Sequence, residues 1–251
     1  MIVIAIIMIL ASLLLPALNS ARERSISTQC LSNLRQVGLS FAEYGSSYHG
    51  YYPVRQGNAV DWGRVLLGEK ELRYSNQTYN YHIKKKTHLY LYCPGKSYSQ
   101  ALKVAEYYGL PSITMTYGIK RELFYGNGYN TRTYEGKFGS SSDFYKEISL
   151  GERNGTYYRP DRMRNISQYC FLGDSINAGS QNLYPLSFWA YESTSKIGGI
   201  RLEHANGSNL LYLDGHAAHL PLQKLLGWRR ENKISVGARI YDNSGNAYHT
   251  L

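Results

Sequence analysis

Histidine and carboxylate side chains gather toward the C-terminus, and these residue types bind metals or transfer protons. The set is Glu203, His204, Asp214, His216, His219 and, further on, His249. Of these, His204, Asp214 and His216 are the weak candidates for metal ligands. In a strand, however, His216 and His219 point to opposite faces, and calcium needs roughly six or more oxygens. We therefore expect structural roles and no bound metal: His204 hydrogen-bonding a hairpin, and Asp214 accepting hydrogen bonds from turn amides.

A nucleophile set can be drawn from Asp174, Ser175 and His204, but the sequence contains no G-x-S-x-G elbow to expose the serine. The pair Gly126 and Gly128 lacks the third glycine and the following helix pattern of a dinucleotide site. The sequence therefore predicts neither a catalytic residue nor a cofactor, and we expect a protein that is not an enzyme.

The chain has three cysteines, Cys30, Cys93 and Cys170, and no pair is spaced as C-x-x-C. Their spacing thus supports neither a zinc site nor a thioredoxin-like motif. In an oxidising compartment one disulfide and one free thiol are expected, and the spacing does not choose the pair.

Composition narrows the class of protein. The net charge is +10, but the basic residues are scattered and the only dense run is Lys84 to Lys86, which argues against a nucleic acid partner. Basic charge also suits an acidic polysaccharide or an anionic membrane. With 25 Tyr and 24 Gly in 251 residues, we expect a folded β-rich head. The tyrosine-rich region 125–158 is the best candidate for a surface that recognises sugars or proteins, although a solvent-facing loop without a ligand is the favoured interpretation.

The element that must carry this head is an N-terminal rod. Residues 1–18 carry no charge, and their number is close to the ~18–20 residues that span a bilayer. A signal peptide would need a basic n-region and a cleavage site, which this segment lacks. We therefore expect residues 1–18 to be a transmembrane segment. Residues 19–47 continue as an amphipathic helix, with Pro16 expected to kink the rod. The predicted packing stripe is Ile26, Cys30, Leu34, Val37, Phe41 and Tyr44.

The head, residues 48–251, reads as short strands between turns. We expect strands at 88–93, 113–119 and 169–174, a short helix at 99–108 and a loop at 125–142. Asp214-Gly215, between 209–213 and 216–220, predicts a β-hairpin.

Two distant segments carry a family resemblance. The run IVIAIIMILASLLLPALNSARERS, followed by CLSNLRQVGLSFAEY, resembles the N-terminal helix of type IV pilin-like proteins. His204 and Asp214-Gly215 are spaced as H-x9-D-G, with Asn209 between them. That spacing is similar to the C-terminal signature of pseudopilin-like proteins of planctomycetes, verrucomicrobia and lentisphaerae. Cys93-Pro94, TYGI at 116–119 and GDS at 173–175 also resemble this family.

The chain departs from the family at its start. The basic leader, the prepilin-peptidase site and the acidic residue just inside the mature N-terminus do not precede Ile2. We therefore expect the true start to lie upstream and Met1 to be an internal methionine.

The resemblance implies an α+β, pilin-like fold, in which one long N-terminal helix packs on an antiparallel sheet. It implies a subunit of a type II secretion or type IV pilus-like filament, held in the inner membrane with its head in the periplasm or at the cell surface. The implied partners are the lipid bilayer, copies of the chain, other pilin-like subunits, a prepilin peptidase and an assembly platform. The alternatives are a membrane-anchored surface protein whose Tyr/Gly-rich head binds glycans or proteins without polymerising, and an anchored metal-dependent enzyme at His204 and Asp214.

Overall fold

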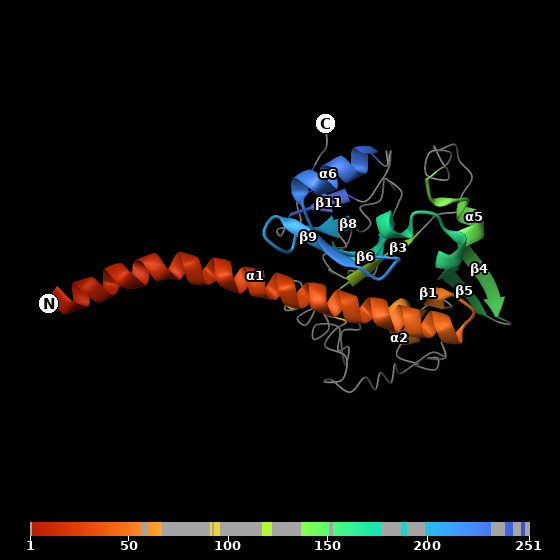
Figure 1. The fold of residues 1–251 in the computed structure, drawn as a ribbon, viewed down its shortest axis with the longest axis horizontal. Coiled ribbons are helices and arrows are strands. Elements are labelled where there is room, and N and C mark those ends of the chain that lie inside the picture. Colours follow the sequence, from red (N-terminus) through yellow and green to blue (C-terminus); the bar gives the residue numbers. More distant parts are fainter. Residues whose placement is uncertain are drawn as a thin grey trace, which may run out of the picture.

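The computed structural model shows one long helix leading into a β-rich head (Figure 1). The structure describes residues 2–56, 60–66, 91, 93–95, 117–121, 137–150, 153–176, 187–189, 199–231, 239–242 and 247–248. Two sheets and the helices α1, α2, α5 and α6 make up the fold of these ranges. The fold is therefore α+β.

Helix α1 spans Ile2–Ser47 without a break. Every residue from 2 to 25 is exposed, and this part projects away from the head (Figure 1). Pro16 lies inside the helix and does not end it. The projecting part bends as a broad arc in Figure 1, without the sharp kink that was expected. The Ser12 hydroxyl donates to the Ile9 carbonyl at 2.7 Å, so this hydroxyl is satisfied within the helix and adds no unmet polar group to the apolar segment.

The second half of α1 packs on the head. Its buried residues are Cys30, Asn33, Leu34, Val37, Gly38, Phe41 and Gly45. Four positions of the predicted stripe are in this set, whereas Ile26 and Tyr44 are only half-buried. Two glycines widen the stripe because the head approaches them closely. A Cβ on Gly38 would lie 3.3 Å from the Gly215 carbonyl oxygen, and a Cβ on Gly45 would lie 2.6 Å from the Tyr52 ring.

A four-stranded antiparallel sheet lies near the C-terminal end of α1, in the order β2-β1-β5-β4. Its strands are β1 Tyr52–Gln56, β2 Val60–Asp61, β4 Tyr145–Leu150 and β5 Arg153–Tyr158. Short helices α2 (Trp62–Leu66) and α5 (Ser141–Phe144) adjoin it.

The larger sheet has eight strands, in the order β10-β9-β6-β8-β11-β12, with β3 beside β6 and β7 beside β3. Their bounds are β3 Tyr117–Arg121, β6 Cys170–Ile176, β7 Ser187–Trp189, β8 Gly199–Arg201, β9 Gly207–Tyr212, β10 Ala217–Pro221, β11 Arg239–Tyr241 and β12 Ala247–Tyr248. The sheet is mixed rather than antiparallel, because β3 with β7 and β8 with β11 pair in parallel. Between β8 and β11 the chain forms a hairpin and helix α6 (Leu222–Glu231).

The larger sheet separates two apolar cores. The core on the α1 side contains Cys30, Leu34, Phe41, Phe171 and Leu211 among other residues. The core on the other side is covered by α6 and contains Cys170, Ile200, Leu202, Leu210, Tyr212, Leu225 and Ile240. Neighbours on β9 thus face opposite cores, as the two-residue period of a strand requires. The sheet is covered on both faces, by α1 and by α6 (Figure 1).

The hairpin predicted around Asp214-Gly215 is present: β9 and β10 pair antiparallel, with Leu211 opposite Ala217. The connection is longer than a two-residue turn. It covers residues 213–216, is closed by the Tyr212 amide donating to the His216 carbonyl at 2.9 Å, and places Gly215 at φ 90°.

Other predicted elements of the head differ from the structure. The strand expected at 88–93 is wrong at Leu91, where the chain forms a 3-10 turn. The strand expected at 113–119 is confirmed at 117–119 by β3, and 113–116 lie outside the described residues. The expected loop at 125–142 ends in α5. Two short 3-10 turns, Pro160–Arg162 and Ile166–Gln168, precede β6, which was predicted as 169–174. The helix expected at 99–108 lies outside the described residues.

Candidate metal centre

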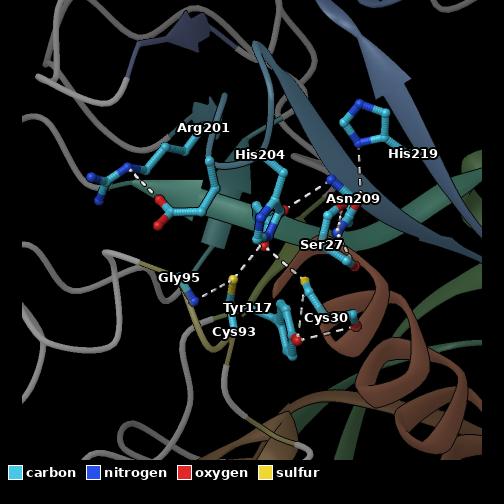
Figure 2. A network of polar contacts seen from close by, with 11 residues as sticks. Ser27, Cys30, Cys93, Gly95, Tyr117, Arg201, His204, Asn209 and His219 are labelled. Carbon is cyan, nitrogen blue, oxygen red and sulfur yellow. Dashed lines mark hydrogen bonds and ion pairs between the residues drawn. The ribbon is translucent and has the colours of Figure 1, made fainter. Parts of the chain in front are cut away.

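Four metal-ligating side chains meet where α1 lies against the larger sheet. They are Cys30 of α1, Cys93, Asp174 of β6 and His204, which follows β8. One ligand atom from each lies within 4.8 Å of each of the others. The four residues are at most 3% exposed, so the cluster is sealed from solvent. Figure 2 shows Cys30, Cys93 and His204 turned toward one another.

The His204 imidazole faces both a thiol and a carboxylate. Its Nε2 is 3.1 Å from Cys93 Sγ and 3.6 Å from Asp174 Oδ2. On the other side, the Cys30 thiol donates to Asp174 Oδ1 at 3.5 Å. The sulfur, nitrogen and oxygen atoms therefore surround a common point rather than lying in a row.

Hydrogen-bond donors surround the cluster and hold its side chains. The Asn209 amide donates to Asp174 Oδ2 at 2.8 Å, and the Gly95 amide donates to Cys93 Sγ at 3.4 Å. The Tyr117 hydroxyl lies 3.4 Å from both the sulfur and the carbonyl oxygen of Cys30. Donors at this position orient ligands and stabilise thiolate and carboxylate forms.

The thiols are protonated at neutral pH when no cation neutralises them. Burial raises the pKa of the Cys30 thiol and raises the pKa of the Cys93 thiol well above its ordinary value. Burial also raises the pKa of Tyr117 well above the usual range for a phenol. Thiols buried in this way are poor nucleophiles, which argues against thiol catalysis.

The carboxyl group and the imidazole also shift toward their neutral forms. Burial raises the pKa of Asp174 to about 7. Burial is also the main cause that lowers the pKa of His204 to about 4, and the neighbouring His219 adds to this shift. A strong ion pair would move both pKa values in the opposite directions. Without a cation, His204 is therefore neutral near pH 7 and Asp174 is only partly ionised, so the two do not form a strong ion pair.

The H-x9-D-G segment docks α1. Asn209 Nδ2 donates to the Ser27 carbonyl of α1 at 3.1 Å, and its Oδ1 lies 3.0 Å from His219 Nδ1 (Figure 2). The carbonyl of Gly215 and the side chain of Leu211 lie against Gly38 of α1. Three of the four motif residues, His204, Asn209 and Gly215, thus sit at the junction of the helix and the head.

The remaining predicted candidates do not join this cluster. Asp214 and His216 are exposed at the hairpin tip, where Asp214 Oδ1 accepts from the His216 amide at 3.1 Å and lies 2.6 Å from His216 Nδ1. Glu203 is buried, with Oε2 2.9 Å from Arg201 Nε. Asp214 therefore organises its own turn, as the sequence predicts. His249 lies outside the described residues.

The structure does not support a catalytic or binding role for the other chemical motifs. In the part of the chain that is described, the Ser175 hydroxyl is buried with no hydrogen-bond partner, so it forms no pair with His204. Lys84 to Lys86 and the glycines 126 and 128 lie outside the described residues.

The region proposed as a recognition surface, 125–158, is only partly a loop. Its described part forms α5, β4 and β5. Tyr145, Tyr157 and Tyr158 are buried there, so these rings stabilise the head and offer no contact area to a sugar.

Sequence reasoning missed the four-residue cluster because its members are far apart: 144 residues separate Cys30 from Asp174, and 111 separate Cys93 from His204. No disulfide joins any of the three cysteines. One signal was available. Each of the four residues lies in a segment that carries the pilin-like resemblance: CLSNLRQ, Cys93-Pro94, GDS at 173–175, and the H-x9-D-G motif.

The fold and the site together define a helix-anchored α+β head with a buried thiol, imidazole and carboxylate cluster. No protein family, curated protein or solved structure matches this chain.

Proposed function

We propose that this chain is a pilin-like structural subunit of a type II secretion or type IV pilus-like filament, held in the inner membrane before assembly. The observation that carries the proposal is the division of α1. Its apolar first half projects bare from the head, while its second half is fixed to the head.

The exposed apolar surface of the first half of α1 must be buried against lipid or protein. Large apolar side chains from Ile2 to Leu18 are 51–78% exposed. A contiguous apolar surface of this kind is rare on monomeric proteins and marks contact with lipid or with other apolar helices. By length and composition α1 is able to cross a membrane, although signal sequences near an N-terminus share these properties. Lipid before assembly, and neighbouring copies of the same helix after it, supply the two coverings.

The fixed half supports a mechanical role. A filament bears load through its helices, so each head must not detach from its own helix. Here α1 is buried at Leu34, Val37 and Phe41 and is hydrogen-bonded to Asn209 from the hairpin. Such a junction suits a subunit pulled by its neighbours. In this proposal the prepilin peptidase, the assembly platform and other pilin-like subunits are the cellular partners, and the chain itself performs no chemistry.

The proposal is tested by placing a charge in the bare half. In the native host, Leu10→Asp is expected to abolish assembly, because a carboxylate among packed apolar helices is costly. Filaments sheared from cells are counted by electron microscopy and immunoblotting. Leu39→Asp is the matched control, because Leu39 is also on α1 and 70% exposed but lies beside the head; this variant is expected to assemble.

Two results contradict the proposal. One is a wild-type chain that stays monomeric in the membrane while the host's secretion filaments assemble without it. The other is a Leu10→Asp variant that is incorporated into filaments as well as the wild type.

A further inference from the structure

We propose that Cys30, Cys93, Asp174 and His204 bind one zinc ion, which fastens helix α1 to the head. The inference stands on the geometry of these four side chains and does not depend on whether the chain polymerises.

The spacing of the ligand atoms fits tetrahedral zinc. Zinc bonds of about 2.0–2.3 Å set the four ligand atoms of a tetrahedron roughly 3.3–3.8 Å apart. Cys93 Sγ lies 3.1 Å from His204 Nε2, and the Asp174 carboxylate lies 3.5 Å from Cys30 Sγ through Oδ1 and 3.6 Å from His204 Nε2 through Oδ2. One ligand atom from each of the four residues lies within 4.8 Å of the others. Small side-chain movements therefore suffice to close the site around an ion.

The donor set selects the metal. Two thiolates and an imidazole favour zinc over calcium or magnesium, which prefer oxygen ligands. All four positions of a tetrahedron are filled by protein, and the residues are buried. A closed, four-ligand site is the structural type of zinc site, with no open position for a substrate or an activated water.

The surrounding hydrogen bonds match such a site. The Gly95 amide is directed at Cys93 Sγ, the Tyr117 hydroxyl lies near Cys30 Sγ, and the Asn209 amide binds Asp174 Oδ2. These groups reduce the negative charge that two thiolates and a carboxylate bring to one cation. Figure 2 shows them placed around the cluster from several chain segments.

The topology gives the ion a task. Cys30 is the ligand from α1. The other ligands are Cys93, Asp174 of β6 and His204, which follows β8. Zinc bound here joins the helix to the centre of the larger sheet. Because the unfolded chain does not hold these ligands together, the free energy of zinc binding stabilises the folded junction.

The test measures metal in the full chain, purified in detergent from cells grown with zinc, iron, copper and manganese. Elemental analysis is expected to give one zinc per chain. Cys93→Ser and His204→Ala are each expected to lower zinc content or affinity at least roughly tenfold. His204→Cys, which offers another thiolate, is expected to retain zinc. Cys170→Ser is the matched control, because Cys170 is a buried cysteine of the other core.

A second measurement covers variants that fail to fold. Wild-type protein is stripped of metal and loaded with cobalt(II). Thiolate-to-cobalt charge-transfer absorption together with the intense visible bands of tetrahedral cobalt supports the site. Three results overturn it: no zinc in wild-type protein even after zinc is added, zinc retained at full affinity in Cys93→Ser and His204→Ala, or a Cys30–Cys93 disulfide found by mass spectrometry in the native protein.

Discussion

At the scale of single residues, chemistry is concentrated where α1 meets the sheet. Cys30 reads from its spacing as one more apolar position of the helix stripe, yet its thiol lies among Cys93, Asp174 and His204. Asp214 and His216, by contrast, are candidate metal ligands in the sequence, but they lie exposed at a hairpin tip. Local spacing predicts turns and stripes, but it does not reveal that segments more than 100 residues apart converge.

The pKa directions predict how zinc binding depends on pH. Zinc requires Cys30, Cys93 and Asp174 to lose their protons, and burial raises all three pKa values, that of Asp174 to about 7. His204, with its pKa lowered to about 4, is already neutral above pH 6 and releases no proton. Each released proton lowers the affinity about tenfold per unit of acidification.

Because two thiols each release a proton, we expect zinc affinity to fall by roughly ten-thousandfold or more between pH 8 and pH 6. Competition with a chromophoric chelator, with its own pH dependence subtracted, measures this change. An affinity that stays constant between these pH values would show that the thiols do not ligate the ion.

At the scale of elements, the sequence predicts the long helix and the terminal hairpin well. The apolar stripe has the helical period, and Asp214-Gly215 is a turn signal whose glycine does adopt a positive φ. The order of strands in the larger sheet could not be predicted, because β8 and β11 pair in parallel only after a hairpin and a helix intervene. At Leu91 the apolar alternation of 88–93 misled, since Leu91 is buried without lying in a sheet.

Two leucines on α1 test which face of the helix carries the packing. Leu34 is fully buried and Leu39 is 70% exposed. Leu34→Ala is expected to reduce the free energy of unfolding by about 2–5 kcal/mol, because it leaves a cavity between α1 and the sheet. Leu39→Ala is expected to change it by less than about 0.5 kcal/mol. Denaturant unfolding in detergent compares them, and equal losses would contradict the packing of α1 on the head.

Two glycines with open surroundings test whether the turn at Gly215 requires a positive φ. A Cβ on Gly215 or Gly227 would meet no atom within 4 Å, but Gly215 has φ 90° and Gly227 lies inside α6. Gly215→Ala is expected to destabilise the protein by roughly 1–2 kcal/mol. Gly227→Ala is expected to stabilise it by up to about 1 kcal/mol. Thermal unfolding measures both changes, and a Gly215→Ala variant as stable as Gly227→Ala would show that the turn is not held at its positive φ.

At the scale of the whole molecule, the chain is a rod with a head on one end (Figure 1). The projecting half of α1 is exposed along its whole length, whereas the other half is held by apolar packing, by Asn209 and, in our proposal, by zinc. This division makes the bare segment available for lipid or neighbouring helices while the head remains fixed. The composition predicted such a segment, but only the structure shows which residues of the head fix the rest of the helix.

The most direct test of the filament proposal is photo-crosslinking in the native host, with a photoreactive amino acid placed at position 10 of the full-length protein. Position 10 lies in the projecting half of α1, and position 39, exposed beside the head, serves as the comparison. If the bare halves bundle, irradiation at position 10 gives a ladder of dimers, trimers and higher oligomers, and position 39 gives few. Monomers alone at position 10, crosslinked only to lipid, would contradict the proposal and leave α1 as a simple membrane anchor.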